Sequence, residues 1–541
     1  MTNSIPELED ADCILVTGSN TTEGHPLVAS RILRAVEKGA KLIVIDPRDT
    51  QLATLAALHL RQRPGTDVAC LNGMMQAIVN EGLEDKEFIE SRTEGFADLK
   101  AALAEYTPER VEAITGIPAA DLVKAARMYA QADRASIVYA MGITQHTTGV
   151  DNVLSCANLA MLTGNIGKPS TGVNPLRGQN NVQGACDMGG LPNVYSGYQA
   201  VTDPNNRAKF EGAWGAEMPP KVGLTVMDMT NAAHEGRLKA MYIVAENPML
   251  SDPDIGHVQK GLEKLDFLVV QDIFPSETSE FADVVLPGAS FAEKEGTFTA
   301  TDRRVQRVRQ AIEPLGEARA DWEIIGELAK RLLAKKGKTP AGTHSGWDYS
   351  HPAEIMAEIA ALTPSYGGVT YERLEKQGFL QWPCPNADHP GTAYLHRERF
   401  SRGVGKFTAV RYREPAELPD EAYPLALTTG RMMFHFHTGT MTRRSRKLAK
   451  EVGDGYAEIS PEDAVALGIS EGERVQLTSR RGQIEARAWI TRRVPPGMVF
   501  VPFHFAESAA NVLTNAALDP VAKIPEFKIC AVRLERATNH P

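Results

Sequence analysis

The order of three segments near the start of the chain most constrains its fold. Residues 13–17 form a short apolar run, residues 26–38 carry apolar side chains at helical spacing, and residues 41–45 form a second apolar run. This order predicts a strand, a helix and a second strand. A β-α-β connection is right-handed, so the two strands should be parallel. The loops after them, residues 18–25 and 46–48, should open on one edge of the sheet, where ligands of open α/β sheets bind.

The alternation of helices and strands continues beyond this unit. Amphipathic patterns predict helices at residues 68–80, 86–93, 119–131, 253–265 and 321–335, and one that begins near residue 150. Apolar runs predict strands at residues 136–141, 240–244 and 268–271. The last two strands belong to a second α/β region, which lacks first strands of its own. The Pro- and Gly-rich region 338–405 is expected to be irregular.

From about residue 423 the pattern changes to short β segments, which predict a β-barrel. One capped helix interrupts them at residues 460–468, where Ser460 is the expected N-cap and Gly468 the expected end. The barrel strands are predicted at residues 425–428, 474–479, 482–490, 498–502 and 528–534.

Composition excludes several classes of function. A chain of 541 residues is too long for one hydrophobic core, so several domains are expected. Its formal net charge of -10 argues against a nucleic-acid surface, and its apolar runs are far shorter than the roughly 20 residues of a membrane span. The first residues lack the features of a signal peptide. Six scattered cysteines without a CxxC pair indicate reduced thiols and a cytoplasmic protein.

The two loops of the first β-α-β unit contain candidate ligand-binding residues. Gly18 permits close backbone approach to a phosphate or a pterin, while Asn20 and Glu23 add polar groups. In the second loop, Asp46 could accept hydrogen bonds from a ribose or a guanine, and Arg48 could pair with phosphate. An ordinary β-α turn and a capped turn with a solvated arginine are the alternative interpretations.

Residues 174–192 form the most distinctive segment of the sequence. It combines Arg177 with six amide or acid side chains among four glycines, and we expect a long functional loop. Amide side chains with close backbone approach suit a large polar heterocycle, and the arginine could hold a carboxylate with two hydrogen bonds. A surface cluster of turns is the alternative, which we regard as the weaker interpretation.

This segment resembles the active-site loop of formate dehydrogenase catalytic subunits in the molybdopterin oxidoreductase superfamily. The resemblance covers essentially the whole chain, through residues 141–145, 162–167, 246–248, 271–272, 278–283, 293–296, 321–322, 429–431, 435–441 and 526–532. It implies an α/β multidomain fold of the formate dehydrogenase/DMSO reductase type with a C-terminal double-psi β-barrel. The implied domains are 1–179 (Rossmann-like), 180–291 (second α/β region, first half missing), 292–405 (connecting region) and 406–541 (barrel).

The resemblance also implies a cofactor, a bis-molybdopterin guanine dinucleotide that carries molybdenum or tungsten. Arg177 matches the family arginine that orients formate. The implied cofactor-binding residues are Gly18, Asn20, Glu23, Asp46, Pro47, Arg48, Gly65, Asp67, Met141, Gly142, Gln145, Gln179, Glu246, Asn247, Gln271, Asp272, Thr278, Asp283, Gly430, Arg431, His435, His437, Asn511 and Lys528.

Three histidines have open roles. His435 and His437 could alternatively be metal ligands, but with no third ligand nearby in sequence we favour cofactor or barrel packing, and we assign no metal ligand. His146 lies near the implied pocket.

The sequence departs from the family at its start. Complete members begin with four cysteines for a 4Fe-4S cluster, a lysine, and a metal-ligating selenocysteine or cysteine that a histidine follows. No Cys-His pair occurs in this sequence. Selenocysteine is encoded by UGA, a stop codon, so we expect Met1 to follow such a recoded codon and the cluster to occur only in the complete protein. An export signal on such a preceding segment stays open.

The predicted function is the catalytic subunit of a formate dehydrogenase, which interconverts formate and carbon dioxide. The resemblance implies electron-transfer partner subunits of an iron-sulfur, NAD-linked or hydrogenase type. The alternatives are a non-catalytic scaffold subunit of the same fold and an oxidoreductase for another substrate, such as nitrate.

Overall fold

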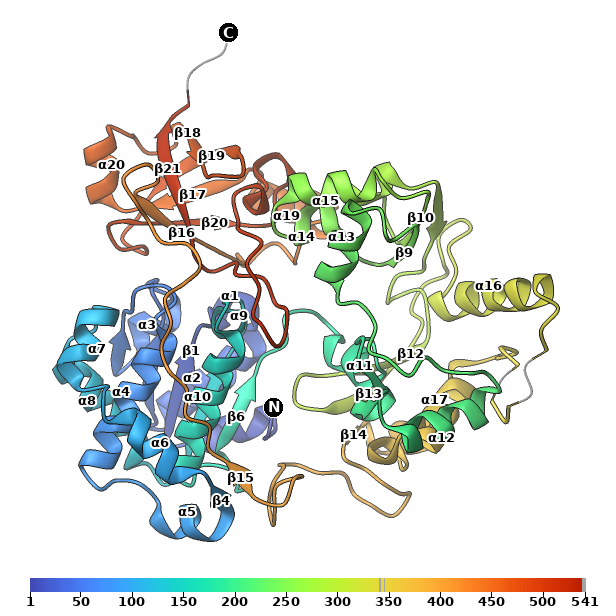
Figure 1. Ribbon diagram of the computed structural model, residues 1–541, viewed down its shortest axis with the longest axis horizontal. Coiled ribbons are helices and arrows are strands. Elements are labelled where there is room, and N and C mark those ends of the chain that lie inside the picture. Colours follow the sequence, from blue (N-terminus) through green and yellow to red (C-terminus); the bar gives the residue numbers. More distant parts are fainter. Residues whose placement is uncertain (340–341, 345, 538–541) are drawn as a thin grey trace. The chain divides into compact units, whose positions relative to one another are not determined.

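The computed structural model describes residues 1–339, 342–344 and 346–537, and it contains two compact units (Figure 1). The first unit comprises Met1–Gly178, Pro248–Val258 and Tyr394–Pro541, and the second comprises Gln179–Asn247 and Gln259–Ala393. The four domains predicted from the sequence stay a prediction. The two compact units are each built from segments that are separated in sequence, so they do not test the predicted domain boundaries.

The first unit contains a parallel sheet of five strands in the order β3-β2-β1-β5-β6. Its strands are β1 (Cys13–Thr17), β2 (Lys41–Ile45), β3 (Leu58–Leu60), β5 (Ala135–Tyr139) and β6 (Gly172–Pro175). The predicted strands at 13–17 and 41–45 are confirmed, and they pair in parallel as expected. Met141, which we predicted at the end of a strand, instead begins the short helix α9 (Met141–Thr144).

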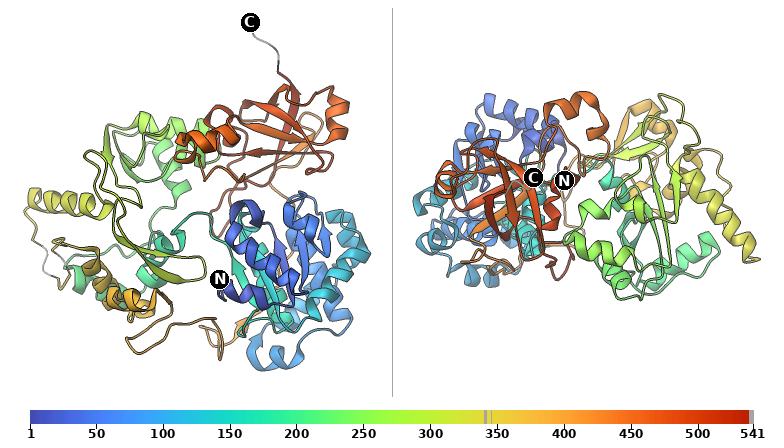
Figure 2. Two further views of the ribbon diagram at one scale, coloured as in Figure 1. Left: turned by 180° about the vertical axis from the view of Figure 1, so that it is seen from behind. Right: turned by 90° about the horizontal axis from the view of Figure 1, so that it is seen from above.

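Helices cover both faces of this sheet. Ile14 and Val16 of β1 pack with Ile32 of α2 (Pro26–Glu37), whereas Cys13 and Leu15 pack against a cluster on the opposite face. Figure 2 shows α2 on the face opposite to the helices that lie in front in Figure 1. The helices that contribute to the opposite face are α4 (Asp67–Asn80), α8 (Ala119–Ala130) and α10 (Gly149–Leu162). The predicted helices in these positions are confirmed within two residues.

The smaller helices of the first unit lie in the connections between these elements. They are α1 (Thr21–Gly24), α3 (Gln51–Leu55), α5 (Lys86–Arg92), α6 (Phe96–Leu103), α7 (Pro108–Thr115), α14 (Pro248–Ser251) and α19 (Arg446–Glu451).

The first unit also contains the predicted barrel, which is closed and has the strand order β16-β20-β17-β19-β18-β21. Its strands are β16 (Leu425–Gly430), β17 (Tyr456–Ile459), β18 (Arg474–Thr478), β19 (Gln483–Ile490), β20 (Met498–Pro502) and β21 (Cys530–Arg536). Strand β17 was not predicted, because the fully buried Glu458 interrupts its apolar run. The predicted capped helix is confirmed as α20 (Pro461–Leu467), with Ser460 Oγ accepting a hydrogen bond from Asp463 N at 3.0 Å.

The second unit contains a parallel sheet of three strands in the order β11-β10-β9. These are β9 (Ala240–Val244), β10 (Phe267–Asp272) and β11 (Val284–Pro287). An antiparallel sheet follows, made of β12 (Gly296–Thr299), β13 (Arg304–Val308) and β14 (Phe379–Gln381). The helices of this unit include α11 (Val182–Asp187), α12 (Pro204–Trp214), α13 (Val226–His234) and α16 (Asp321–Lys335).

Two of our predictions for the later chain need correction. The region 338–405 is not irregular throughout, because it contains α17 (Pro352–Leu362), α18 (Tyr371–Gln377) and β14. Both helices are capped by a side chain, His351 for α17 and Thr370 for α18, and such short capped helices are easily hidden among prolines and glycines. The helix predicted at 253–265 is shorter and is observed as α15 (Ile255–Leu262).

Candidate functional site

The order in which the chain adds strands to the first sheet reverses between β1 and β5. Strands β2 and β3 lie on one side of β1, and β5 and β6 lie on the other, so the loops after β1 and β5 diverge at their carboxyl ends. Gly18 and Gly142 meet there, with Gly142 N donating to Gly18 O at 2.9 Å. A Cβ on Gly18 would come within 2.6 Å of the Gly142 backbone, so only glycine fits. Ligands of open α/β sheets bind at such a switch point.

Asn20 offers an unused hydrogen-bond donor close to this point. Its side-chain oxygen accepts a hydrogen bond from Thr22 Oγ1 at 3.2 Å. Its Nδ2 is buried and has no partner in the described part of the chain. A buried donor without a partner is costly, so a ligand that accepts this hydrogen bond would stabilise the loop.

The second predicted loop is tied to the barrel by a buried ion pair. Arg48 donates to both carboxylate oxygens of Glu458 at 2.7 and 2.8 Å, and its guanidinium lies 3.4 Å from the Phe500 ring centroid. Arg493 bridges Glu458 at 3.3 Å and Glu23 at 2.8 Å. The predicted residues Arg48 and Glu23 thus take part in one ionic chain between the sheet edge and the barrel.

Asp46 and Pro47 shape the same loop through hydrogen bonds. Asp46 Oδ1 accepts a hydrogen bond from Arg48 N at 2.9 Å, and Pro47 O accepts one from Arg61 Nε at 3.0 Å. Loss of solvation raises the pKa of Asp46 above its usual range, although Arg48 and His59 oppose the shift.

Two cations of the barrel lie near this loop without a carboxylate partner. Lys528 Nζ donates to Thr429 O at 2.7 Å, and loss of solvation and the nearby Arg431 lower its pKa to about 7. Burial also lowers the pKa of Arg431 to about 10. Within the described residues, no carboxylate forms an ion pair with either side chain. Cations held in this way favour an anionic ligand, which would compensate their charge.

Arg177 lies just beyond the end of β6. Leu176 N donates to Tyr139 O at 2.7 Å, which holds the segment against β5. The Arg177 carbonyl accepts a hydrogen bond from His25 Nε2 at 2.7 Å. A Cβ on Gly178 would come within 3.2 Å of Arg431 Nη2, so the segment also passes close to the barrel arginine. The structure therefore brings Arg177 to the edge that carries Gly18 and Gly142.

The predicted residues at the start of α4 form a buried polar cluster. Asp67 Oδ1 accepts a hydrogen bond from Gln62 Nε2 at 3.2 Å, and burial raises the pKa of Asp67 to about 6. His146 Nε2 donates to Gly142 O at 2.9 Å and lies 3.8 Å from Asp67 Oδ2. His146, whose role the sequence left open, therefore has a structural role, since its ring holds the backbone of Gly142.

Gly65 and Gln145 flank this cluster. Gly65 packs its backbone against the ring of Pro415, where a side chain would collide. Gln145 N donates to Met141 O at 3.0 Å and closes α9.

The barrel histidines make internal hydrogen bonds. His435 is bonded to Thr442 Oγ1 at 3.2 Å and to Val452 O at 2.8 Å. His504 Nδ1 donates to the His437 carbonyl, and His504 Nε2 accepts from Met432 N at 3.0 Å. Because each ring nitrogen of His504 has a fixed role, this histidine sets the loop that contains Arg431. The described residues contain no cluster of three metal-ligating side chains.

Asn511 is another predicted residue with internal partners. Its Nδ2 donates to Leu250 O at 2.8 Å and to Ser251 O at 3.1 Å, and its Oδ1 accepts from Thr514 Oγ1 at 3.3 Å. Gly430, in contrast, provides space, since a Cβ there would come within 2.7 Å of the Phe500 ring.

The second unit presents its own polar edge at the ends of β9 and β10. Asn247 Oδ1 accepts hydrogen bonds from Thr278 N at 3.2 Å and Thr278 Oγ1 at 2.7 Å, and its Nδ2 donates to Glu277 at 2.8 Å. Gln271 is bonded to Tyr242 and, at 2.7 Å, to Asp321.

The acidic residues of this edge differ in role. Asp283 accepts a hydrogen bond from Leu268 N at 2.7 Å and so joins β10 to the segment before β11. Asp272 Oδ1 accepts from Ile273 N at 2.6 Å. Loss of solvation and the nearby Asp272 raise the pKa of Glu246. Gln179, at the other end of the unit, is its first residue.

The amide-rich segment 174–192 is not one long loop, which corrects our prediction. It contains the end of β6 and all of α11. Asp187 Oδ1 accepts hydrogen bonds from Gln183 Nε2 at 2.7 Å and from Tyr198 OH at 2.8 Å, and Asp187 Oδ2 accepts one from Tyr366 OH at 2.5 Å. Several of its polar groups therefore stabilise the second unit.

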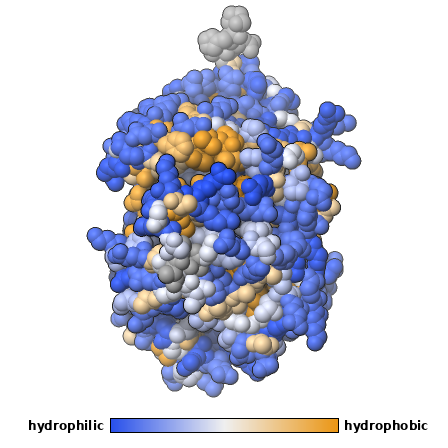
Figure 3. Space-filling model, turned by 90° about the vertical axis from the view of Figure 1, so that its right-hand side faces the viewer, coloured by the Kyte–Doolittle hydropathy of each residue, from blue (hydrophilic) through white to orange (hydrophobic). Residues whose placement is uncertain are grey.

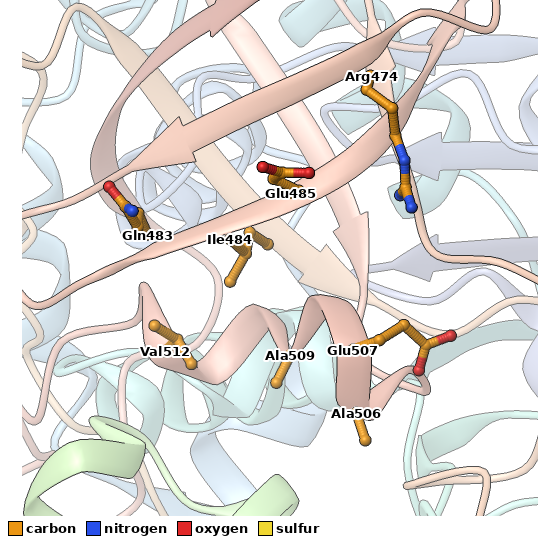
Figure 4. A pocket seen from close by; sticks show the side chains of 8 residues that line it. All are labelled: Arg474, Gln483, Ile484, Glu485, Ala506, Glu507, Ala509 and Val512. Atoms are coloured by element: carbon orange, nitrogen blue, oxygen red, sulfur yellow. The ribbon is translucent and has the colours of Figure 1, made fainter. Parts of the chain in front are cut away.

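A separate hollow of about 360 Å³ lies on the outer side of the barrel (Figure 4). Its lining side chains come from β18, β19 and the turns at 506–512, and include Arg474, Glu485 and Glu507. No residue of the predicted site lines it.

Comparison with known proteins identifies the class of protein that has this fold and this ligand-binding sheet edge. Residues 1–331 match the family described as "Molybdopterin oxidoreductase", and residues 425–531 match the "Molydopterin dinucleotide binding domain". The chain belongs to the molybdopterin oxidoreductase family, and its ligand is a molybdopterin dinucleotide.

Within this family the chain is similar to formate dehydrogenase subunits. It is 53% identical over 538 residues to "F420-dependent formate dehydrogenase 1 subunit alpha" of Methanococcus maripaludis, covering 99% of this chain and 78% of that protein. It is 42% identical over 544 residues to "Formate dehydrogenase H" of Escherichia coli, covering 99% and 74%. The structure of "Acetylene Hydratase from Pelobacter acetylenicus" has the same fold, with a TM-score of 0.76, 23% identity, and coverage of 99% and 79%.

The residues of the first unit fit such a ligand. A dinucleotide carries a diphosphate, and Arg431 and Lys528 supply two cations that lack carboxylate partners in the described chain. Asn20 supplies a buried donor, and the contact of Gly18 with Gly142 lets a ligand approach the backbone. None of the described helices is long and apolar enough to cross a membrane.

Proposed function

We propose that this chain is the catalytic subunit of a formate dehydrogenase. The reaction converts formate to carbon dioxide with release of two electrons and one proton, or runs in reverse. The observation that carries the proposal is the position of Arg177, which the structure holds at the ligand-binding edge of the first sheet. The formate dehydrogenase subunits to which the chain is 42–53% identical support the choice of substrate.

The proposed cofactor is a pair of molybdopterin guanine dinucleotides that hold one molybdenum or tungsten. The metal supplies the two-electron chemistry when the cofactor is bound. The chain's own contribution is to bind the phosphates through Arg431 and Lys528 and to hold the carboxylate of formate through Arg177. A polar edge in each unit, at Gly18 and at Asn247, supports one dinucleotide per unit.

The electrons leave through partner subunits in this proposal. Relatives of this chain are named as alpha subunits, which implies further subunits, and three are named as F420-dependent. The 4Fe-4S cluster belongs to the same electron path in complete members of the family. The scattered cysteines of the sequence support a cytoplasmic location.

The test uses holoenzyme purified anaerobically with its partner subunits. We expect formate-dependent reduction of a viologen dye, with molybdenum or tungsten found by elemental analysis. Arg177→Lys keeps the charge but loses the two-donor geometry, so the rate should fall on the order of 100-fold. Leu27→Ala, at an 81% exposed side chain, is the control. Nitrate reduction without formate oxidation would show another substrate, and cofactor-free protein without either activity would show a scaffold.

A further inference from the structure

His25 lies between the first loop of the sheet and the segment that contains Arg177. It follows α1 directly and precedes Pro26, the first residue of α2. Its Nε2 is 2.7 Å from the carbonyl oxygen of Arg177, which is 152 residues away in sequence. A carbonyl only accepts hydrogen bonds, so Nε2 carries the proton and donates it.

The hydrogen bond from His25 fixes the backbone of Arg177 on one side. On the other side, Leu176 N donates to Tyr139 O at 2.7 Å. Together these two bonds attach residues 176 and 177 to the junction of α1 and α2 and to the end of β5. The Arg177 side chain extends from this backbone, so the two hydrogen bonds restrict where its guanidinium can lie.

The surroundings of His25 favour a neutral ring. Burial lowers the pKa of His25, the hydrogen bond to Arg177 opposes this shift, and the nearby charge of Arg431 adds to it. A neutral ring donates to the carbonyl without adding a second positive charge near Arg431. The ring thus acts through its geometry.

We propose that His25 is a positioning residue that sets where the Arg177 guanidinium meets the carboxylate of the substrate. This inference rests on the proposed function, because it concerns the same arginine and the same carboxylate. His25 does not touch the substrate in this proposal, and its effect passes through the backbone of Arg177. The alternative is a histidine that only ties two loops together and has no influence on substrate binding.

Three variants of the holoenzyme distinguish these roles. His25→Gln places an amide donor near the position of Nε2, His25→Phe keeps the ring volume without a donor, and His25→Ala removes both. We expect KM for formate to rise about tenfold in His25→Phe and His25→Ala, which is the order of effect of one lost hydrogen bond, while kcat changes less than threefold. His25→Gln should restore KM to within about threefold of the parent. Leu27→Ala changes an 81% exposed side chain of α2 and should leave both constants unchanged.

A second measurement does not depend on turnover. Phenylglyoxal modifies arginine side chains, and peptide mass spectrometry reports the extent of modification at Arg177. Formate should protect Arg177 in the parent protein, and the protecting concentration should rise about tenfold in His25→Phe but not in His25→Gln.

The two measurements separate the two proposals. If formate does not protect Arg177 in the parent protein, the proposed function fails. If protection occurs but KM and the protecting concentration stay within twofold in His25→Phe and His25→Ala, the positioning role of His25 is overturned. An equal loss of kcat in His25→Gln and His25→Phe, with KM unchanged, would likewise show that His25 only ties two loops together.

Discussion

The two parallel sheets of this protein differ in how their faces are covered. In the first unit every residue of β1 and β5 is buried. In the second unit Tyr242 and Val244 of β9 are each 37% exposed, and Phe267 of β10 is 46% exposed. Residues 240, 242 and 244 pair in register with residues 267, 269 and 271, so these side chains share one face.

An open face is unusual for a parallel sheet, which is normally covered on both sides. Figure 3 turns the right-hand side of Figure 1 toward the viewer and shows apolar side chains gathered in its upper part. Apolar runs predicted three of the five strands of the first sheet and two of the three strands of the second, yet they did not predict which face would be covered. Similar apolar strand sequences therefore differ in how much of their surface is buried, so we expect them to contribute differently to stability.

The largest expected effect concerns the buried ion pair of the first unit. Glu458→Ala leaves Arg48 enclosed without its carboxylate, so we expect a loss of about 4 kcal/mol in unfolding free energy. The measurement is chemical denaturation followed by hydrogen exchange of the barrel strands. Glu485→Ala, on the exposed side of β19, should cost less than about 0.5 kcal/mol. Equal losses in the two variants would contradict the role given to the ion pair.

The second prediction compares the two sheets directly. Leu15→Ala removes a side chain that is fully buried in the covered sheet, and should cost about 3 kcal/mol. Val244→Ala removes a side chain from the open face and should cost less than about 1 kcal/mol. Hydrogen exchange of β1 and β9 amides reports each unit separately. A similar loss in both would show that the open face is covered in solution.

The pH dependence should have opposite signs in the two units. The pKa of Lys528 is lowered to about 7 in the folded chain, so the unfolded chain binds more protons between about pH 7 and its unperturbed pKa of about 10.4. Stability of the cofactor-free first unit should therefore rise with pH in this window, by at most about 1.4 kcal/mol per pH unit. Lys528→Met should flatten this rise. If the unfolding free energy of the unsubstituted protein does not change between pH 7 and 9, the lowered pKa of Lys528 is refuted.

Glu246 should act in the opposite direction. Its pKa is raised in the folded chain, so the folded chain binds more protons and stability falls as pH rises through the interval above the unfolded pKa. Glu246→Gln removes this dependence, and the second unit should then be slightly more stable at pH 7. Hydrogen exchange of β10 at pH 5 and pH 7 provides the comparison.

Local features of the sequence predicted much of the fold. The strands at 13–17 and 41–45, the helix at 321–335 and the cap at Ser460 depend on neighbouring residues, and all are confirmed. Strand β17 was missed because Glu458 is buried only through its pairing with Arg48, 410 residues away in sequence. His25 and His504 were missed for the same reason, since a histidine shows its partner only when the fold brings distant segments together.

The candidate site shows the same division. Gly18 could be predicted because a glycine after a strand indicates close backbone approach, whereas Gly142 was implied by the family resemblance, and the structure brings the two together. Arg48 and Asn511 could not be interpreted correctly from local pattern, because their partners come from β17 and from residues 250–251. The amide-rich segment predicted a functional loop, yet Asp187 is held by Tyr366, 179 residues away.

The smallest expected effect tests the open face itself. Val284 is 37% exposed on β11 and lies in register with Val269 of β10. Val284→Lys should change unfolding free energy by less than about 0.5 kcal/mol, because its side chain already contacts water. It should nevertheless lower the fluorescence of bound anilinonaphthalene sulfonate, a dye that binds exposed apolar surface. The matched variant Leu27→Lys removes an 81% exposed apolar side chain from α2, where no open sheet face exists, and should leave dye fluorescence unchanged. Equal dye binding in the parent and Val284→Lys would mean that this face is not the apolar surface that distinguishes the second sheet.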